Sequence, residues 1–261
     1  MALIDINGVS LEVERLTGSS RGGRAPIVFL HEGLGSVAQW STRELNWPQA
    51  LCEACERDGI VYSRRGYGRS DPIPEVRTTQ RHSADYMHRQ AWDVLPQLLS
   101  TLGVQQPVLL GHSDGGTIAL LHASRHPVSA CVVMAPHVIV EPESIRAIVQ
   151  AREAYEQGPL RERLSRYHDD VDSAFWQWND VWLSQEFRSF DIREDCRRIQ
   201  SPVLAIQGRQ DPYGTLQQIE DIRPDHGRIE RCVLEHCGHA PQRDQTQACT
   251  EQIVHFLAAC A

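Results

Sequence analysis

This sequence of 261 residues lacks long apolar runs and any excess of positive charge. No stretch approaches the roughly 20 apolar residues that a membrane-spanning helix needs. Residues 1–5 show no basic region followed by an apolar block, so we expect no secretory signal and a cytoplasmic location. The formal net charge of −8 argues against nucleic acid or an anionic membrane surface as the main partner.

Metal signatures are also missing. The 12 histidines are scattered and form no pattern such as His-Glu-x-x-His. The 8 cysteines are an even number, but without a signal sequence we expect free thiols rather than disulfides. Cys52 and Cys55 form a Cys-x-x-Cys pair, a pattern shared by redox and metal sites. Because no second cysteine or histidine pair lies at zinc spacing, we interpret them as two small residues on one helical face.

The apolar pattern predicts the fold class. Residues 3–16 alternate apolar and polar around Asn7-Gly8, which predicts a hairpin at the edge of a sheet, and residues 18–24 predict a loop. Six further segments predict strands, near residues 27–30, 60–63, 107–111, 130–135, 202–207 and 229–234. Helical patterns separate most of these segments, and another follows at 246–259. This alternation indicates an α/β fold with a mainly parallel central sheet and helices on both faces.

One short string carries the strongest chemical signal. Residues 111–115 read Gly-His-Ser-Asp-Gly, between the apolar run 107–110 and the apolar-periodic run 117–121. This order predicts a strand, a tight turn and a helix, with Ser113 presenting its hydroxyl at the bend and glycines avoiding clashes around it. The amino end of the helix directs unpaired N–H groups at whatever the serine attacks. The pattern indicates a nucleophilic serine.

A nucleophilic serine needs a base, and the base needs an orienting acid. Asp211 follows the predicted strand at 202–207, and His239 follows the predicted strand at 229–234. Each residue alone is typical of an ordinary loop or a helix cap. The order Ser113, Asp211, His239, with each member on the loop after a strand, is that of a catalytic triad.

With these motifs, the sequence resembles the α/β-hydrolase superfamily over nearly its whole length, in the small, capped branch of esterases and C–C hydrolases. Residues 29–35, Phe-Leu-His-Glu-Gly-Leu-Gly, resemble the segment that supplies an oxyanion-hole N–H. Residues 61–70 resemble the strand and Gly-x-Gly-x-Ser turn before the elbow strand. One departure is Glu32, because the family usually has glycine directly after the histidine. The resemblance implies an oxyanion hole made by the N–H of Asp114 and that of Gly33 or Leu34, with no metal and no organic cofactor.

The resemblance also implies a helical cap at 137–196, inserted into a core domain made of residues 1–136 and 197–261. The insert is charged and aromatic, and the next strand-like run begins only at Pro202. We expect some of its aromatic side chains to line an apolar substrate pocket and others to bury the cap against the core. The residues expected at the substrate are Trp176, Trp178, Trp182, Tyr213 and His112.

Asp114, directly after the serine, bears on the choice of substrate. A carboxylate there disfavours anionic acyl groups and can pair with an ammonium. The string resembles the Gly-x-Ser-Asp-Gly-Gly elbow of hydrolases that cleave amino-acid esters. Alternatively, the side chain caps the helix or pairs with Arg64 or Arg65. The C–C hydrolases of aromatic degradation usually carry asparagine before the serine, where this chain has His112.

Three functions follow as hypotheses. The first is a serine hydrolase that cleaves a small carboxylic ester, thioester or lactone. The second is a hydrolase of C–C bonds in vinylogous diketones from aromatic catabolism, with arginine and tryptophan residues of the cap holding the substrate carboxylate. The third is a non-catalytic ligand receptor on the same fold. Each takes a small molecule as its partner, and the sequence leaves the oligomeric state open.

Overall fold

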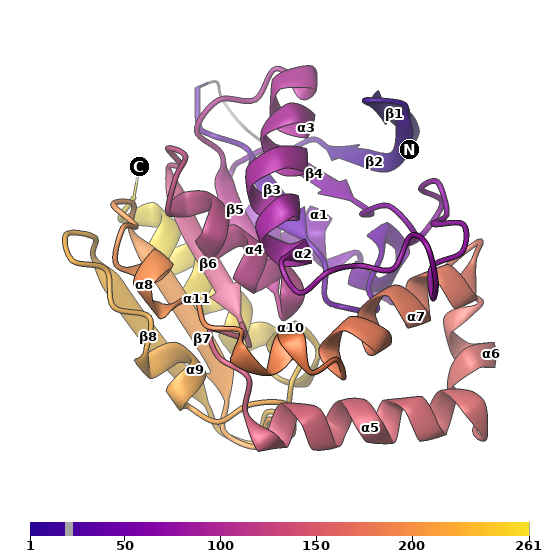
Figure 1. Cartoon of the computed structure of the whole chain (residues 1–261). Coiled ribbons are helices and arrows are strands. Elements are labelled where there is room, and N and C mark those ends of the chain that lie inside the picture. The colour runs from indigo at the N-terminus through magenta and orange to yellow at the C-terminus, as the bar shows by residue number, and fades with distance from the viewer. Residues whose placement is uncertain (19–22, 261) are drawn as a thin grey trace.

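The computed structural model describes residues 1–18 and 23–260, and in these residues one sheet of eight strands forms the centre of the molecule (Figure 1). The strands are β1 (Ala2–Ile6), β2 (Val9–Leu16), β3 (Ile27–Leu30), β4 (Gly59–Tyr62), β5 (Val108–His112), β6 (Ala130–Met134), β7 (Val203–Gly208) and β8 (Ile229–Leu234). Their order across the sheet is β1-β2-β4-β3-β5-β6-β7-β8. Four residues of the predicted loop at 18–24, residues 19–22, lie outside the described part of the chain.

Most strand pairs are parallel. β1 and β2 form the predicted antiparallel hairpin and β2 pairs antiparallel with β4, whereas every pair from β4 to β8 is parallel. Leu30 pairs with Gly111, and His112 pairs with Met134. This register aligns the carboxyl ends of β3, β5 and β6 at one edge of the sheet. The predicted α/β fold with a mainly parallel sheet is therefore confirmed.

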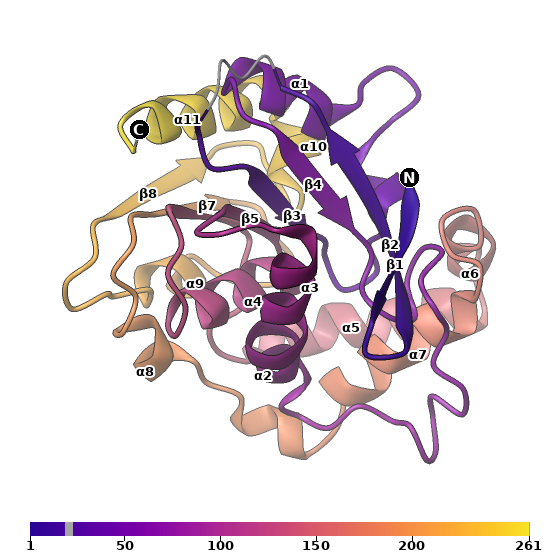
Figure 2. The same ribbon diagram turned by 90° about the horizontal axis from the view of Figure 1, so that it is seen from above.

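Helices cover both faces of the sheet, with α1 and α11 on one face and α3 and α4 on the other (Figure 2). The helices are α1 (Trp47–Ala54), α2 (Tyr86–Arg89), α3 (Leu95–Leu102), α4 (Asp114–Ala123), α5 (Pro142–Glu156), α6 (Leu160–Leu164), α7 (Val171–Trp182), α8 (Arg193–Cys196), α9 (Gln217–Glu220), α10 (Pro241–Asp244) and α11 (Thr246–Ala258). A π-helical turn, Gln90–Val94, joins α2 to α3. Two 3₁₀ turns lie at Val37–Trp40 and Glu186–Ser189. Within the described ranges, no helix is long and apolar enough to cross a membrane.

Successive strand residues alternate between two cores. In β3, Val28 and Leu30 face the core shared with α3 and α4, whereas Ile27 and Phe29 face the core shared with α1 and α11. A strand that is apolar on both faces is typical of the centre of a parallel sheet covered by two helical layers. The alternation explains why the central strands appear in the sequence as short continuous apolar runs.

Cys52 and Cys55 belong to the core beside α1 and α11. Burial raises the pKa of the Cys52 thiol to about 12 and that of the Cys55 thiol to about 11. A thiol that resists ionisation is a poor redox group and a poor metal ligand. This environment supports their interpretation as small core residues.

The segment between β6 and β7 is helical, and its helices α5, α6 and α7 form a separate layer below the sheet in Figure 1. α5 and α7 pack against each other through aromatic side chains, with the rings of Tyr155 and Phe175 stacked at 3.7 Å between centroids. The division into a core and a cap domain, with boundaries at 137 and 196, stays a prediction.

Candidate active site

Ser113 lies in the sharp turn between β5 and α4. Its φ of 53° falls in the left-handed region that non-glycine residues rarely adopt. Neighbouring glycines permit the turn, because a Cβ at Gly111 would collide with the backbone of Gly115 and a Cβ at Gly115 with the carbonyl of Leu30. The backbone of this turn is therefore strained, and its conformation presents the serine hydroxyl beyond the end of β5.

The predicted partners of Ser113 meet it at the carboxyl ends of β7 and β8. His239 Nε2 lies 2.9 Å from Ser113 Oγ. His239 Nδ1 lies 2.8 and 2.9 Å from the two carboxylate oxygens of Asp211. Hydroxyl, imidazole and carboxylate thus form one continuous chain of hydrogen bonds, in which the imidazole is placed to accept the serine proton.

Further hydrogen bonds hold the carboxylate of Asp211. Gln207 Nε2 donates to one oxygen over 2.7 Å, and the main-chain N–H of Tyr213 donates to the other over 2.8 Å. Burial alone would raise the pKa of Asp211, but the hydrogen bond and charge of His239 lower it below its ordinary value. The carboxylate is therefore ionised at neutral pH and can stabilise an imidazolium at His239.

A cavity of about 220 Å³ opens beside Ser113. The loops after β3, β5, β6, β7 and β8 meet side chains of α5 and α7 around it. Its lining consists of Glu32, Gly33, Leu34, His112, Ser113, Asp114, His137, Ile148, Trp178, Trp182, Tyr213, His239, Ala240 and Arg243. The cavity therefore joins the serine, the histidine and most of the residues that the sequence predicts at the substrate.

Trp176 is the exception and corrects one prediction. Trp178 and Trp182 are four residues apart, share one face of α7 and both line the cavity. The ring of Trp176 instead packs edge-on against Tyr155, and the guanidinium carbon of Arg77 lies 3.6 Å from its centroid. Helical residues two positions apart point in different directions, so Trp176 and Trp178 cannot both face the cavity.

Tyr213 and His112 both line the cavity, but their surroundings differ. The Tyr213 ring lies beside that of His239, with 4.5 Å between the centroids. The His112 ring has protein partners at both nitrogens, because Nε2 lies 2.6 Å from the main-chain oxygen of His239 and Nδ1 contacts the carboxylate of Glu32. His112 thus lines the cavity, as the sequence predicts, and also contacts the main chain of His239; its contact with a substrate stays a prediction.

The loop after β3 carries Gly33 and Leu34, the two residues that the sequence predicts as possible oxyanion donors. The N–H of Gly35 donates to the carbonyl of Glu32 over 3.1 Å, which closes a turn with Gly33 and Leu34 at its centre. The N–H groups of these two central residues are not used by the turn's own hydrogen bond. Both residues line the cavity together with Asp114. Gly33 and Leu34 therefore both qualify as the second donor.

Arg64 organises this loop, a role that the sequence did not reveal. Its guanidinium donates to the main-chain oxygens of His31 and Glu32 over 2.5 and 2.8 Å. On the cavity side, a Cβ at Gly33 would collide with the indole of Trp178. Glycine at position 33 therefore allows an aromatic wall of α7 to approach the backbone beside the serine.

The side chain of Asp114 is fully buried and accepts a hydrogen bond from Tyr86. The Tyr86 hydroxyl donates to Asp114 Oδ2 over 2.5 Å and accepts from Trp182 Nε1 over 3.0 Å. Burial raises the pKa of Asp114, while the charge of Arg64 acts in the opposite direction. The hydrogen-bond partner of Asp114 is thus Tyr86, whereas the sequence-based alternatives were a helix cap or a pair with Arg64 or Arg65.

His137 and Ile148 line the cavity and were not singled out in the sequence. His137 follows β6, at the same edge of the sheet as the serine. Burial lowers its pKa to about 3, which leaves the ring neutral. Its place after a parallel strand was a usable signal, because ligands of such sheets bind at the carboxyl ends of the strands. Ile148 on α5 offered no comparable signal.

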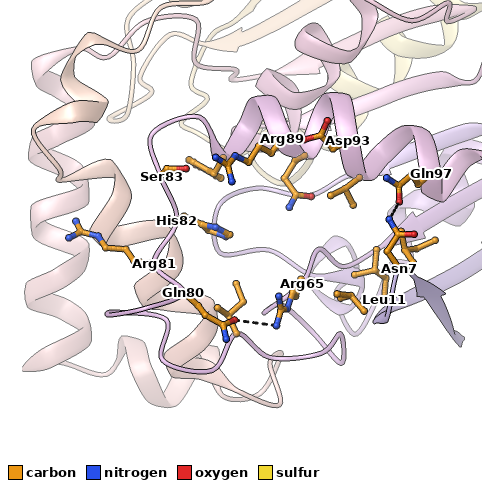
Figure 3. Close-up of a pocket in the computed structure, with 16 residues that line it drawn as sticks. Asn7, Leu11, Arg65, Gln80, Arg81, His82, Ser83, Arg89, Asp93 and Gln97 are labelled. Atoms are coloured by element: carbon orange, nitrogen blue, oxygen red, sulfur yellow. Dashed lines mark hydrogen bonds between the residues drawn. The ribbon is translucent and has the colours of Figure 1, made fainter.

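A second, larger cavity of about 460 Å³ is lined in part by Tyr86 (Figure 3 shows this cavity). Asn7 and Gln97 lie at one end of it and Gln80 and Arg81 at the other, as Figure 3 shows. None of the three residues of the Ser113 hydrogen-bond chain lines it. Ser113 and His239 line the smaller cavity instead, and Tyr86, which lines the larger one, hydrogen-bonds to Asp114 and Trp182 of the smaller one.

Comparisons with known proteins bear on the family and the fold of the chain. The sequence model of the alpha/beta hydrolase family matches residues 27–252. A RutD protein of Pseudomonas savastanoi pv. phaseolicola, whose name proposes carbamate hydrolysis, is 26% identical over 259 residues, 90% of this chain and 95% of that protein. The Serine hydrolase BPHL of Mus musculus is 30% identical over 223 residues, 81% of this chain and 70% of that protein. The enol-lactonase from Burkholderia xenovorans superimposes with a TM-score of 0.72 at 19% identity, covering 98% of this chain and 100% of that one, which shows the fold alone.

Proposed function

Because the chain belongs to the alpha/beta hydrolase family, we propose that it is a serine hydrolase that cleaves a small carboxylic ester, thioester or lactone. The observation that carries this proposal is the hydrogen-bond chain from Ser113 through His239 to Asp211 at a strained turn. A serine hydroxyl is a weak nucleophile until a neighbouring base accepts its proton, and the base needs a third group to orient it.

In the proposed mechanism, Ser113 Oγ attacks the carbonyl carbon of the substrate while His239 Nε2 takes the hydroxyl proton. Asp211 stabilises the imidazolium and keeps the ring in the tautomer that carries a proton on Nδ1. His239 then gives its proton to the leaving group. Water, activated by the same imidazole, hydrolyses the acyl-enzyme and frees Ser113. The protein's own groups suffice for these steps.

The negative charge on the substrate oxygen needs donors at the moment of attack. The proposed donors are the N–H of Asp114, at the start of α4, and the N–H of Gly33 or Leu34. Such donors are typically worth about 3–4 kcal/mol each in the transition state. The turn at residues 32–35 and the guanidinium of Arg64 support this role, because they hold the loop against the serine.

The cavity supports a small substrate with a compact apolar acyl group. Its volume of about 220 Å³ and its walls of Trp178 and Trp182 suit such a group. Asp114 lies next to Ser113, but its fully buried carboxyl group is hydrogen-bonded to Tyr86 and offers no exposed carboxylate to a substrate. Because the string at residues 111–116 resembles the elbow of hydrolases that cleave amino-acid esters, aminoacyl esters belong in the first substrate panel, together with simple esters and lactones.

A second candidate is carbamate hydrolysis, which the names of the RutD relatives favour. A carbamate ester presents the same carbonyl carbon to Ser113, and the same acyl-transfer steps apply. Turnover of phenyl carbamate against phenyl acetate separates the two candidates, because both release the same phenol. A clear preference for the carbamate would replace the ester as the proposed substrate.

The first experiment measures hydrolysis of p-nitrophenyl acetate and butyrate by the wild type, by Ser113→Ala and by Ser189→Ala, an exposed serine far along the chain. We expect turnover by the wild type and the Ser189 variant and almost complete loss in Ser113→Ala. A fluorophosphonate should label Ser113 covalently. A wild type that is neither active nor labelled would overturn the proposal and favour a ligand receptor.

A wild type that clears the colour of a ring-fission diketone but leaves both esters intact would favour the C–C hydrolase. That hypothesis assigned the substrate carboxylate to arginine residues of the cap. The arginine among the described lining residues is Arg243 of α10, outside residues 137–196. This position supports testing esters first.

A further inference from the structure

Glu32 has no part in the proposed mechanism, although it lines the cavity beside Ser113 and replaces a glycine that is usual in the family. Its side chain contacts Nδ1 of His112 through one carboxylate oxygen. Its other oxygen lies 4.0 Å from a guanidinium nitrogen of Arg243. A carboxylate beside an oxyanion hole would by itself oppose the negative charge that forms there. The contact with His112 therefore calls for a physical explanation.

The His112 ring faces a hydrogen-bond acceptor at each nitrogen. Nε2 lies 2.6 Å from the main-chain oxygen of His239, and a carbonyl oxygen can only accept. Nδ1 faces the carboxylate of Glu32, which when ionised also only accepts. A neutral imidazole has one N–H and satisfies one of these partners. An imidazolium has two and satisfies both.

Gln242 adds to this pattern. Its amide lies 3.2 Å from His112 Nδ1, and its Oε1 has no hydrogen-bond partner among the described residues. Turning the amide about its last bond offers this oxygen as a further acceptor to an N–H on Nδ1. The described neighbours of the ring can thus all serve as acceptors.

The contact with His112 also bears on the ionisation of Glu32. Burial alone would raise the pKa of Glu32, but the charge of His112 and the hydrogen bond to it lower that pKa overall, with a smaller contribution from Arg243. A protonated His112 in contact with this carboxylate would nearly cancel its charge and leave little net field at the proposed oxyanion hole. The other titratable groups that act on this pair are His31, His137, His168, Tyr213, His239 and Arg243.

We propose that Glu32 and His112 form a positioning pair for the proposed hydrolysis. The carboxylate holds His112 as a doubly protonated ring, and that ring clamps the main chain of His239 so that its Nε2 stays at Ser113. This inference rests on the proposed function and adds residues that act only through His239. His239 lies on an irregular loop between β8 and α10, where a main-chain anchor matters most.

The test compares Glu32→Gln, which keeps the shape and removes the charge, with Glu156→Gln, the same change at an exposed position on α5. For p-nitrophenyl acetate we expect kcat of Glu32→Gln to fall by about 10- to 100-fold, the effect of a catalytic group displaced by a fraction of an ångström to one ångström. KM should stay within about twofold, since substrate binding is unchanged. Fluorophosphonate labelling of Ser113 should slow in the same proportion.

Nitrogen NMR of the imidazole rings gives a readout that a purely structural role would not change. At about pH 8, where an ordinary histidine is neutral, the wild type should show protons on both nitrogens of His112. Glu32→Gln should show a proton on one nitrogen. His112→Gln, whose amide can donate to the His239 carbonyl, should retain more kcat than His112→Leu, which has no donor.

The outcomes separate this inference from the function on which it rests. Wild-type kcat in Glu32→Gln, together with a singly protonated His112 in the wild type, would overturn the positioning pair while a labelled Ser113 leaves the hydrolase standing. A doubly protonated His112 in an enzyme that is neither labelled nor active would instead locate the failure in the proposed function.

Discussion

Two histidine–carboxylate pairs lie side by side in this molecule, His239 with Asp211 and His112 with Glu32. The two rings are 5.2 Å apart between centroids. In each pair, Nδ1 faces the carboxylate. The pairs differ in what Nε2 meets, which is the hydroxyl of Ser113 in the first and the main-chain oxygen of His239 in the second.

Exposure is reversed between the pairs. In the first, the histidine side chain is 18% exposed and the carboxylate 1% exposed. In the second, the histidine is 2% exposed and the carboxylate 20% exposed. A hydroxyl can give up a proton and a carbonyl cannot, so we propose that the same chemical pair acts as a base in one place and as a clamp in the other. The partner and the direction of burial, rather than the residue types, decide the role.

Breaking the first pair at its histidine should have the largest effect. His239→Gln removes the base, and we expect kcat for p-nitrophenyl acetate to fall by roughly a millionfold, as for the loss of a serine or histidine from a comparable triad. Stopped-flow and long-incubation assays would measure the residual rate. Activity within tenfold of the wild type would mean that another group accepts the serine proton.

Removing the charge of the first pair should have the next largest effect. Asp211→Asn keeps the size of the side chain but no longer favours the Nδ1–H tautomer of His239, and we expect a loss of about ten-thousandfold in kcat. The same assay measures it, with circular dichroism as the control for folding. A loss no greater than that of Glu32→Gln would make the two pairs equivalent and contradict the comparison.

The carboxylates of Asp211 and Glu32 should both stabilise the folded chain at neutral pH. The pKa of Asp211 and that of Glu32 are both lowered in the folded chain, against burial, by their histidine partners. Each stabilisation is present above the ordinary carboxylate range near pH 4 and is lost as the pH falls toward the lowered value. We expect Glu32→Gln to lose less unfolding free energy than the wild type between pH 7 and about pH 3, by on the order of 1 kcal/mol. Urea unfolding at the two pH values measures the difference, and equal losses would contradict it.

The smallest effect on kcat is expected at Gln242, which lies beside the pair of His112 and Glu32. Gln242→Leu removes the amide near His112 Nδ1 but leaves the contact with Glu32, and we expect kcat to change by no more than about threefold, in line with the modest net worth of a neutral hydrogen bond. Steady-state kinetics with p-nitrophenyl acetate measures it. A loss as large as that of Glu32→Gln would show that Gln242, rather than Glu32, holds the ring.

The strands of this fold could be predicted because their signal is local. The run predicted at 107–111 is β5 at Val108–His112, and the runs at 27–30 and 229–234 coincide with β3 and β8. β3 and β5 are buried on both faces, so they must be mainly apolar and bounded by residues that turn the chain, whereas the edge strand β8 is partly exposed and carries Glu230 and Arg231. Both conditions can be recognised in a few consecutive residues.

The site was predictable where it depends on strand ends and unpredictable where it depends on side-chain direction. Ser113, Asp211 and His239 each follow a parallel strand, so the fold brings them to one edge. The choice between Trp176 and Trp178 depended on the rotation of α7 about its axis. Because this helix has aromatic residues on several sides, its sequence does not predict that rotation. The contact of Tyr86 with Asp114 joins positions 28 residues apart, and no local sequence pattern predicts it.

The sequence by itself determined the class of fold, the serine at the elbow and the order of its two partners, because short-range steric and apolar patterns dictate strands and turns. Only the tertiary structure decided which aromatic residues face the cavity, and that His112 serves the main chain of His239. It also brought the carboxylate of Glu32 into contact with His112. These outcomes depend on distances between loops that are remote in the chain, and hydrogen-bond direction and burial exist only once those loops have packed together.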